Sequence, residues 1–432
     1  MTESSQAPAW KRSSLLSLAD YHNGAAFNPS HWGEEGLPII RIEQINNPSA
    51  PTDFYTGPLA PQNAVTTGDL IFSWSATLKA VIWKNGDGAL NQHLFKVVPK
   101  NGTNKAFLKY VLEQNMERIS SGSQGSTMKH ITRGELQRYQ VEVPALEAEQ
   151  DRIAEILSTL DEAIEQTEAL IAKHQQIKAG LMHDLFTRGV TPDGHLRPTR
   201  EQAPDLYKES PLGWIPKEWE VVSTEDCATK APGSTTIGPF GSDLISSDYR
   251  SEGVPVVFVR DVKEDAFVWN SDVFITHEKA QQLSAHAVRS GDLLSTKMGL
   301  PPCVCCEYPN WMEDGVITAD IIRLRPDPAI VNTRWLSAAL NSDAFKRQVQ
   351  AITAGVTRPK VTLSDFRKLR LARPGLAEQT MSARRLVGLA DLSSSEKAKL
   401  DKLHKQKRGL MHDLLTGKVP VNATPNVQED IA

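Results

Sequence analysis

The stretch GLMHDLFTRGV at residues 180–190 returns almost unchanged as GLMHDLLTGKV at residues 409–419. The first six residues of the two copies are identical, and 229 positions separate Gly180 from Gly409 in a chain of 432 residues. A phrase repeated over this distance indicates that the protein consists of two related halves.

Weaker matches extend the repeat outward from this phrase. Residues 35–45, 66–78 and 125–150 match residues 252–262, 289–300 and 355–379 in the same order. The offset between the halves grows from 209 at the paired tryptophans, Trp10 and Trp219, to 230 at the last of these segments. The second half thus contains about twenty extra residues in its globular part, where loops tolerate insertion.

Each half has the same internal order. Short apolar runs bounded by Gly, Pro, Asn and Asp, such as residues 36–42 and 253–262, are typical of strands. Short helical segments follow at residues 107–119 and 333–352, and one long helix closes each half. The pattern predicts an α+β protein with two similar mixed domains and two long helices.

The two long helices have the spacing of a coiled coil, because their apolar residues alternate in steps of four and three. The residues on this seam are Ile153, Leu157, Leu160, Ile164, Ile171, Leu181 and Leu185 in the first helix, and Leu386, Leu389, Leu400, Leu403, Leu410 and Leu414 in the second. Polar residues interrupt the seam at Thr167, His174, Lys178, Ser393, Glu396 and Lys407, as register-fixing positions do. We therefore expect the two helices to pack on each other. The alternative is a pair of amphipathic helices that each cover only their own domain.

Two copies of one domain-plus-helix unit pair most simply about a pseudo-twofold axis. This symmetry predicts an antiparallel pair of helices, each about 60 Å long at 1.5 Å per residue. Residues 187–219, rich in Pro, Gly and charged residues, would connect the first helix to the second domain.

Composition limits the protein class. The sequence has no apolar run long enough to span a membrane and no apolar signal core at its N-terminus, so we expect a soluble, cytoplasmic protein. Four cysteines, Cys227, Cys303, Cys305 and Cys306, are too few for a disulfide framework in a chain of this length. The net charge of −4 argues against a protein that coats nucleic acid indiscriminately, although local basic surfaces remain compatible with it.

The sequence resembles the specificity (S) subunits of type I restriction–modification systems. The resemblance rests on residues 125–132 (GSTMKHIT), 143–157, 208–222 and 238–244 (GPFGSDL), and on the doubled GLMHDL, in family order along almost the whole chain. The first half has no clear counterpart of residues 238–244. By this resemblance the chain divides into a first target recognition domain (1–146), a first conserved helix (147–186), a connector (187–215), a second recognition domain (216–375), a second conserved helix (376–416) and a flexible tail (417–432).

The resemblance implies a non-catalytic reader of double-stranded DNA. Each recognition domain would read one half of a bipartite site, and the helices would set the unread spacer and dock two modification (methyltransferase) subunits. ATP-dependent restriction subunits would complete the nuclease. S-adenosylmethionine, ATP and magnesium are expected on those partners, and no cofactor on this chain.

Candidate DNA contacts must come from loops that carry hydrogen-bond donors and acceptors. The loops at residues 120–130 and 353–360 offer Ser123, Gln124, Thr127, Lys129 and His130 in the first domain, and Thr357, Arg358 and Lys360 in the second. Arg and Lys can read guanine and Gln can read adenine in the major groove. The alternatives are phosphate contacts without base reading, or a surface for the methyltransferase subunit. Residues 238–244 form either a further loop at the DNA backbone or a simple hairpin corner.

Catalytic and metal-binding motifs are weak in this sequence. It contains no phosphate-binding GxxxxGK[ST] loop, and its Pro301-Pro302 pair lacks the flanking residues of an amino-methyltransferase. The D-x-K triplet at 261–263 and the two His-Asp pairs at 183–184 and 412–413 lack further ligands. The cysteines 303–306 with Cys227 lack the spacing of a zinc site, which favours buried thiols. We therefore predict no metal site. A coiled-coil scaffold with protein-binding ends and an autonomous DNA-modifying enzyme are the competing hypotheses.

Overall fold

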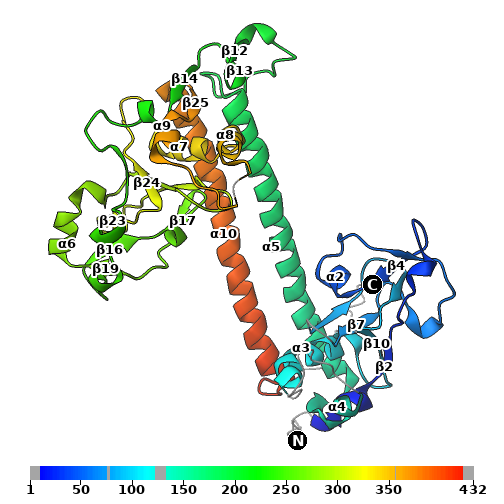
Figure 1. Ribbon diagram of the computed structural model, residues 1–432. Coiled ribbons are helices and arrows are strands. Elements are labelled where there is room, and N and C mark those ends of the chain that lie inside the picture. Colours follow the sequence, from blue (N-terminus) through cyan, green and yellow to red (C-terminus); the bar gives the residue numbers. More distant parts are fainter. Residues whose placement is uncertain (1–9, 75–77, 122–132, 356, 422–432) are drawn as a thin grey trace, which may run out of the picture. The chain divides into compact units, whose positions relative to one another are not determined.

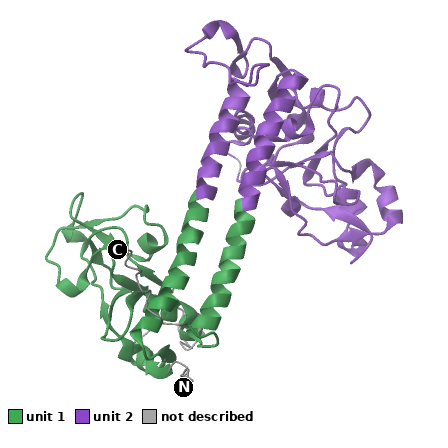
Figure 2. Ribbon diagram, turned by 180° about the vertical axis from the view of Figure 1, so that it is seen from behind, with its two compact units in different colours: residues 1–169, 396–432 green, residues 170–395 purple. Residues whose placement is uncertain are grey.

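The computed structural model describes residues 10–74, 78–121, 133–355 and 357–421. The chain forms two compact units, residues 1–169 with 396–432 (unit 1) and residues 170–395 (unit 2). Each unit combines one globular domain with a segment of both long helices, α5 (Glu147–Thr187) and α10 (Leu376–Leu415), as the colours of Figure 2 show.

The first domain is built mainly of short strands. They are β1 (Trp10–Ser14), β2 (Ala19–Asn23), β3 (Trp32–Gly33), β4 (Leu37–Ile40), β5 (Phe54–Tyr55), β6 (Ala64–Val65), β7 (Leu70–Ser73), β8 (Lys79–Ile82), β9 (Gly88–Leu90), β10 (Leu94–Pro99) and β11 (Gln140–Pro144). They form a four-stranded sheet in the order β2-β10-β7-β8, a five-stranded sheet in the order β3-β5-β4-β9-β6, and the pair β1-β11. Helices α3 (Lys105–Ser121) and α4 (Arg133–Arg138) precede β11.

The second domain has an equivalent set of strands. They are β14 (Glu220–Ser223), β15 (Thr235–Ile237), β16 (Val254–Val257), β19 (Phe274–Ile275), β20 (Ala287–Val288), β21 (Leu293–Thr296), β22 (Cys305–Glu307), β23 (Gly315–Ile317), β24 (Ile321–Leu324) and β25 (Arg370–Arg373). The sheet orders are β15-β24-β21-β22, β19-β16-β23-β20 and β14-β25. Helices α7 (Thr333–Leu340), α8 (Asp343–Thr353) and α9 (Leu363–Lys368) gather near the start of α10 (Figure 1). The smaller pairs are β12-β13 (Tyr207–Ser210 with Gly213–Pro216), which lies in the predicted connector, and β17-β18 (Val262–Lys263 with Ala266–Phe267).

The main sheets of the two domains match, although β3 of the first domain and β17-β18 of the second have no counterpart. The antiparallel order β2-β10-β7-β8 corresponds to β15-β24-β21-β22, and the parallel pair β4-β9 corresponds to β16-β23. In these parallel pairs Ile40 lies opposite Leu90 and Val257 lies opposite Ile317. This correspondence confirms the predicted α+β fold with an internal repeat.

The structure also reveals a counterpart of the 238–244 loop in the first domain. Gly24 follows β2 as Gly238 follows β15. A Cβ atom at Gly24 would lie 2.2 Å from the carbonyl oxygen of Leu90, and one at Gly238 would lie 2.2 Å from the carbonyl carbon of Thr318. Both positions therefore require glycine because the backbone of a neighbouring segment passes directly over them. The sequence concealed this match because the residues after Gly24 are not those after Gly238.

One buried glutamine joins each domain to the start of the helix that follows it. The Gln150 side chain donates to the carbonyl oxygens of Gly102 and Pro144 and accepts from the Asn104 amide. Gln379 donates to Ile330 and Pro374 and accepts from Asn332 in the same way. Both glutamines are fully buried, so each satisfies backbone groups that water cannot reach.

The long helices pack against each other within each unit, and they run antiparallel. In unit 1, Ile153 and Leu157 of α5 share a core with Met411 and Leu414 of α10. In unit 2, Leu185 of α5 shares a core with Leu386 of α10, Met381 and Ala338. The C-terminal part of each helix thus packs against the domain of the other half. This excludes the alternative in which each helix covers only its own domain.

The predicted seam residues differ in how deeply they are buried. Ile153, Leu157, Ile164, Ile171, Leu185, Leu386 and Leu414 are buried. Leu160, Leu181, Leu389, Leu400, Leu403 and Leu410 are half-buried. A narrow seam between two helices leaves flanking positions partly accessible, so this gradation fits two-helix packing better than a globular core.

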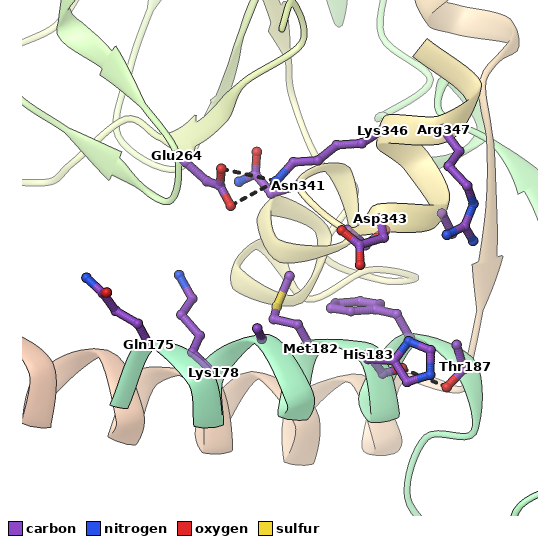
Figure 3. Close-up of a pocket in the computed structure, with 14 residues that line it drawn as sticks. Gln175, Lys178, Met182, His183, Thr187, Glu264, Asn341, Asp343, Lys346 and Arg347 are labelled. Atoms are coloured by element: carbon purple, nitrogen blue, oxygen red, sulfur yellow. Dashed lines mark hydrogen bonds and ion pairs between the residues drawn. The ribbon is translucent and has the colours of Figure 1, made fainter. Parts of the chain in front are cut away.

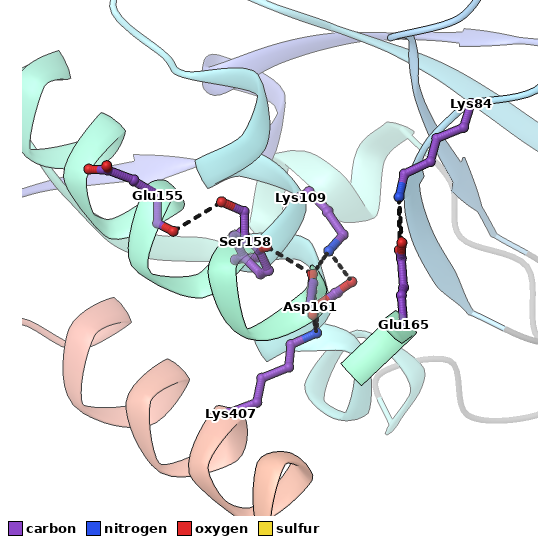
Figure 4. A network of polar contacts seen from close by, with 9 residues as sticks. Lys84, Lys109, Glu155, Ser158, Asp161, Glu165 and Lys407 are labelled. Atoms are coloured by element: carbon purple, nitrogen blue, oxygen red, sulfur yellow. Dashed lines mark hydrogen bonds and ion pairs between the residues drawn. The ribbon is translucent and has the colours of Figure 1, made fainter. Parts of the chain in front are cut away.

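A charged cluster holds α10 to the first domain (Figure 4). The Asp161 carboxylate receives Lys407 Nζ at 2.6 Å, Lys109 Nζ at 2.5 Å and the Tyr110 hydroxyl at 2.8 Å, and Lys407 also reaches Glu113 at 3.2 Å. Because these side chains are at most about one-fifth exposed, water screens the contacts poorly.

Lys178 is the repeat equivalent of Lys407, and it pairs with a different partner. Its Nζ lies 2.6 Å from an oxygen of Asp265, whose other oxygen accepts from the Asn341 amide at 2.7 Å. Both lysines thus interrupt the apolar seam in order to bind a carboxylate of the neighbouring domain. Such polar positions specify helix register.

A corner of unit 2 fastens the predicted connector to the start of α10. Arg197 donates to both carboxylate oxygens of Glu378, at 2.5 and 2.8 Å, and the Val190 amide donates to Glu378 at 2.9 Å. The indole N–H of Trp219 lies 3.3 Å from the same carboxylate. The connector is therefore part of the packed unit.

None of the helices in the described residues is both long and apolar enough to cross a membrane.

Replacing Asp161 with Asn should destabilise unit 1 by about 2 kcal/mol at neutral pH, because two lysines lose their carboxylate. Burial raises the pKa of Asp161, but Lys109 and Lys407 outweigh it and leave this pKa below its usual value. The carboxylate therefore stabilises the fold fully above its unfolded pKa of about 3.9, and this contribution disappears as the pH falls through the lower folded value. Hydrogen exchange in α3 and in residues 396–415, measured against pH, checks both statements.

Glu165→Gln is the matched control on the same helix. Glu165 pairs with Lys84 at 2.8 Å, but both side chains are more than half exposed. Loss of this ion pair should lower the free energy of unfolding by about 0.5 kcal/mol or less. Equal effects of the two substitutions would contradict a structural role for the Asp161 cluster.

Candidate nucleic-acid interface

Three loops of the second domain meet at one surface, which we call the loop cluster: residues 238–245, 297–303 and 357–360. Lys297 Nζ lies 5.3 Å from the centre of the Phe240 ring, which joins the first two loops. Met298 and Lys360 form a backbone bridge, and the Val361 amide donates to the Lys297 carbonyl at 2.9 Å, which joins the last two. The sheet order β15-β24-β21-β22 brings these distant segments together.

A hollow of about 370 Å³ lies within the loop cluster. Pro239, Leu244, Met298, Arg260 and Asp320 are among the residues that line it. The 238–244 segment is therefore one wall of a concave surface, which is more than a hairpin corner. Phe240 stands at this surface with 63% of its side chain exposed.

The candidate residues Thr357, Arg358 and Lys360 are exposed on the loop cluster. The candidate residues of the first domain, Ser123, Gln124, Thr127, Lys129 and His130, lie outside the described residues. Sequence reasoning missed Phe240, Lys297 and Leu300 as members of the same surface. The Leu-Pro-Pro run at residues 300–302, shortly after the apolar strand that ends at Thr296, was the available signal for the 297–303 loop.

Other basic residues of the second domain are partly neutralised. Lys346 pairs with Glu264 at 3.1 Å, and Arg373 pairs with Glu220 at 2.7 Å. By contrast, no ion pair within the described residues involves Lys297. Lys297 therefore contributes a positive charge to the loop cluster that no ion pair in the described part of the chain balances.

A second hollow of about 260 Å³ lies in unit 2 between the last turns of α5 and the junction of α7 with α8 (Figure 3). Lys178, His183, Lys346 and Arg347 line it together with acidic Glu264 and Asp343. Because Lys346 pairs with Glu264, and Lys178 with Asp265, much of its charge is already balanced. This hollow is not a concentrated anion site.

The repeated GLMHDL phrase presents the same exposed residues in both units. Its glycines, Gly180 and Gly409, lie in helix interiors, and a Cβ atom at either would meet nothing within 4 Å. Neither glycine has a positive φ angle. Glycine in a helix interior costs about 1 kcal/mol relative to alanine, and here neither backbone geometry nor packing within the described chain requires it. Each glycine leaves room at the helix surface for a close approach of another backbone.

Gly180 is exposed on the side of α5 that lies away from Met182. At 100° per residue, Gly180 lies roughly 160° around the helix from Met182, which lines the hollow of unit 2. Among the residues near Gly180 on the helix surface that are identical and exposed in both helices are Lys173 and His183, with Lys402 and His412 as their counterparts. His183 lies at the edge of this surface, since it also lines the hollow of unit 2. We call Lys173, Gly180 and His183 the first helix stripe, and Lys402, Gly409 and His412 the second.

The weak catalytic motifs are accounted for by structural roles. Asp261 of the D-x-K triplet is fully buried and accepts from the Phe258 and Asn270 amides and from the Ser271 hydroxyl. Asp184 of the first His-Asp pair forms an ion pair with Arg188 at 2.9 Å. These carboxylates are engaged within the fold.

The cysteine cluster consists of buried, unbridged thiols. Cys305 and Cys306 lie in β22, and all four cysteines are buried and free. Burial raises the pKa of the Cys227, Cys303 and Cys306 thiols to about 12. Within the described ranges, no group of three or more His, Cys, Asp or Glu side chains is placed to hold a metal ion.

Comparisons with known proteins agree with this architecture. A model of the type I restriction modification DNA specificity domain matches residues 9–175. The chain is 26% identical to the type I restriction enzyme EcoBI specificity subunit of Escherichia coli, over 88% of this chain and 79% of that protein. It is 23% identical to the MjaVIII specificity subunit of Methanocaldococcus jannaschii, over 83% of this chain and 80% of that protein.

The fold is shared with solved structures. The S subunit of a type I restriction–modification system from M. genitalium superimposes with a TM-score of 0.61 at 14% identity, covering 96% of this chain and 98% of that one. A chain from a structure of type I restriction–modification complex assembly and conformational transition gives a TM-score of 0.53 at 16% identity, covering 95% and 99%. These matches show that residues 9–175 match the type I restriction modification DNA specificity domain, and that the chain is similar along most of its length to specificity subunits of type I restriction–modification systems.

Proposed function

We propose that this chain determines which DNA sequence a type I restriction–modification complex recognises, with each domain reading one half of a bipartite site. The chain is the non-catalytic specificity subunit. The observation that carries the proposal is the repetition of one sheet topology in two domains on two antiparallel helices. Two related domains read two related but separate segments of DNA, and the helices between them leave a spacer unread.

The two helix stripes suggest that the chain binds two copies of one partner protein. Two equivalent surfaces on one chain suit two identical proteins, and a glycine allows a partner backbone to approach closely. We assign the two stripes to two methyltransferase subunits. Their S-adenosylmethionine, and the ATP and magnesium of the restriction subunits, belong in this proposal to the partners. The complex would act in the cytoplasm, where cellular DNA is accessible.

The function is tested by methylome sequencing of cells that express this chain with the methyltransferase encoded beside it. We expect methylated adenines in one bipartite sequence. Arg358→Ala should relax the sequence of one half-site, and Lys129→Ala should relax the other, each with a loss of about 1–3 kcal/mol in binding for a true base contact.

Three results would count against base reading or against the function. Equal weakening on all DNA sequences would move Arg358 and Lys129 to the phosphate backbone. A purified chain that binds DNA without any sequence preference or salt dependence would favour the scaffold hypothesis. Methyl transfer by the purified chain alone would favour an autonomous enzyme.

Partner docking is tested by Gly180→Gln and Gly409→Gln. Each substitution adds a good helix former and should stabilise its helix by up to about 1 kcal/mol. Each should nevertheless weaken one methyltransferase contact by about tenfold or more, so that native mass spectrometry finds one bound subunit where the unaltered chain holds two.

Gly388→Gln is the control for these variants. Gly388 is also a helix-interior glycine with nothing within 4 Å of a Cβ atom, but its repeat equivalent is Thr159, so a larger residue suits that position. This variant should still bind two subunits. Full occupancy in the Gly180 and Gly409 variants would refute docking at the helix stripes.

The unread spacer is tested by lengthening both helices. Seven residues inserted after Leu170, with seven opposite them in α10, add about 10 Å to the helix pair, which equals roughly three base pairs at 3.4 Å each. The methylated sequence should keep both half-sites and gain a longer spacer. Altered half-sites with an unchanged spacer would disprove this role of the helices.

A further inference from the structure

Leu300 is the most exposed large apolar residue of the loop cluster. Its side chain is 88% exposed at the tip of the loop between β21 and β22. The loop is nevertheless fixed at its base, because the Lys297 amide donates to the Asp320 carbonyl at 2.8 Å and the Cys303 amide donates to the Thr296 carbonyl at 2.7 Å. A single exposed leucine is ordinary on a protein surface. An exposed leucine is unusual when the base of its loop is held by hydrogen bonds and the surface around it is basic.

Lys297 lies beneath this tip and is only 5% exposed. Its Nζ contacts the Ala319 carbonyl oxygen at 3.5 Å and the face of Phe240. Burial and the neighbouring charge of Lys360 lower the Lys297 pKa, and Asp320 only partly opposes them. A buried cation without a carboxylate at contact distance is costly unless an anion arrives from outside.

We propose that the loop cluster binds duplex DNA by inserting Leu300 at a base step while Lys297 and Lys360 face the adjacent phosphates. The inference rests on the proposed function and adds a second way in which the protein recognises its DNA sequence. Leu, Phe, Met and Pro side chains act as wedges between bases in other DNA-binding proteins. Leu300 would therefore select a base step that unstacks easily, without a hydrogen bond to any base.

The charge of the surface favours DNA over a protein partner. Lys297, Arg358 and Lys360 belong to the loop cluster with Leu300, and Arg260 lines its hollow, against the carboxylates of Asp243 and Asp320. The phosphates on both sides of a base step provide the anions that Lys297 lacks within the chain. A protein surface would have to provide a dense acidic patch around a hole for Leu300.

The wedge is tested with the complex of the full chain and its methyltransferase, on duplexes that carry the site found by methylome sequencing. 2-Aminopurine replaces single bases of the second half-site, other than the adenine that is methylated. The unaltered complex should raise 2-aminopurine fluorescence at one step. Leu300→Ala should abolish that signal and weaken binding about tenfold. Ile352→Ala, an exposed apolar residue of the same domain outside the loop cluster, should change neither.

The buried cation is tested by Lys297→Met, which keeps the length of the side chain and removes its charge. The melting temperature of the variant should equal or exceed that of the unaltered chain, because a buried charge without an ion pair is removed. DNA binding should weaken, and the slope of log K against log salt should fall by about one. Lys368→Met, at an exposed lysine outside the loop cluster, is the control.

The outcomes separate the wedge from the proposed function. If the unaltered complex selects no DNA sequence, the proposed function itself fails. If it selects a sequence, and Leu300→Ala then behaves like Ile352→Ala, only the wedge is overturned. If Leu300→Ala instead reduces methyltransferase binding in the absence of DNA, the loop cluster is a protein contact and the wedge is likewise overturned.

Discussion

The exchange of helix ends between the two halves is the contact on which the rest of the structure depends. The last turns of α10 complete the core of the first domain, and the last turns of α5 complete a core beside the second. Apolar packing supplies most of the stabilisation. Lys407 and Lys178 fix the register of the two long helices, because each lysine reaches its carboxylate at only one position along the seam. A shift by one turn would separate both lysines from these carboxylates.

Much of this architecture can be read from the sequence, because it is encoded in local periodicity. The doubled phrase around Gly180 and Gly409 and the seam from Ile153 to Leu414 indicate two halves and two paired helices. It is harder to predict from the sequence which domain each helix end contacts, since this depends on residues as distant as Leu157 and Met411. Spacing alone predicts that the helices meet, and only the packed structure shows that they exchange domains.

The candidate site was predicted less completely than the fold. The donor-rich loop of Arg358 and Lys360 predicts them as DNA contacts, and this stays a prediction, whereas Phe240 and Lys297 belong to loops that look unrelated in sequence. Only the order of β15, β24 and β21 brings these segments together. Lys297 in particular appears as one lysine among many, and its distinctive property is burial, which depends on three separate segments. The number of charged residues in the sequence therefore does not locate the basic surface of this domain.

The exchanged helices also determine when the protein can fold during its synthesis. The core of the first domain needs Met411 and Leu414, which are translated more than 220 residues after α5 is complete. At bacterial or eukaryotic elongation rates of 5–20 residues per second, the first domain waits roughly 10 to 45 seconds for them. During that time the apolar stripe of α5 has no α10 to cover it. A nascent chain of this design therefore depends on chaperones, or on the early arrival of another protein at α5, to avoid aggregation on the ribosome.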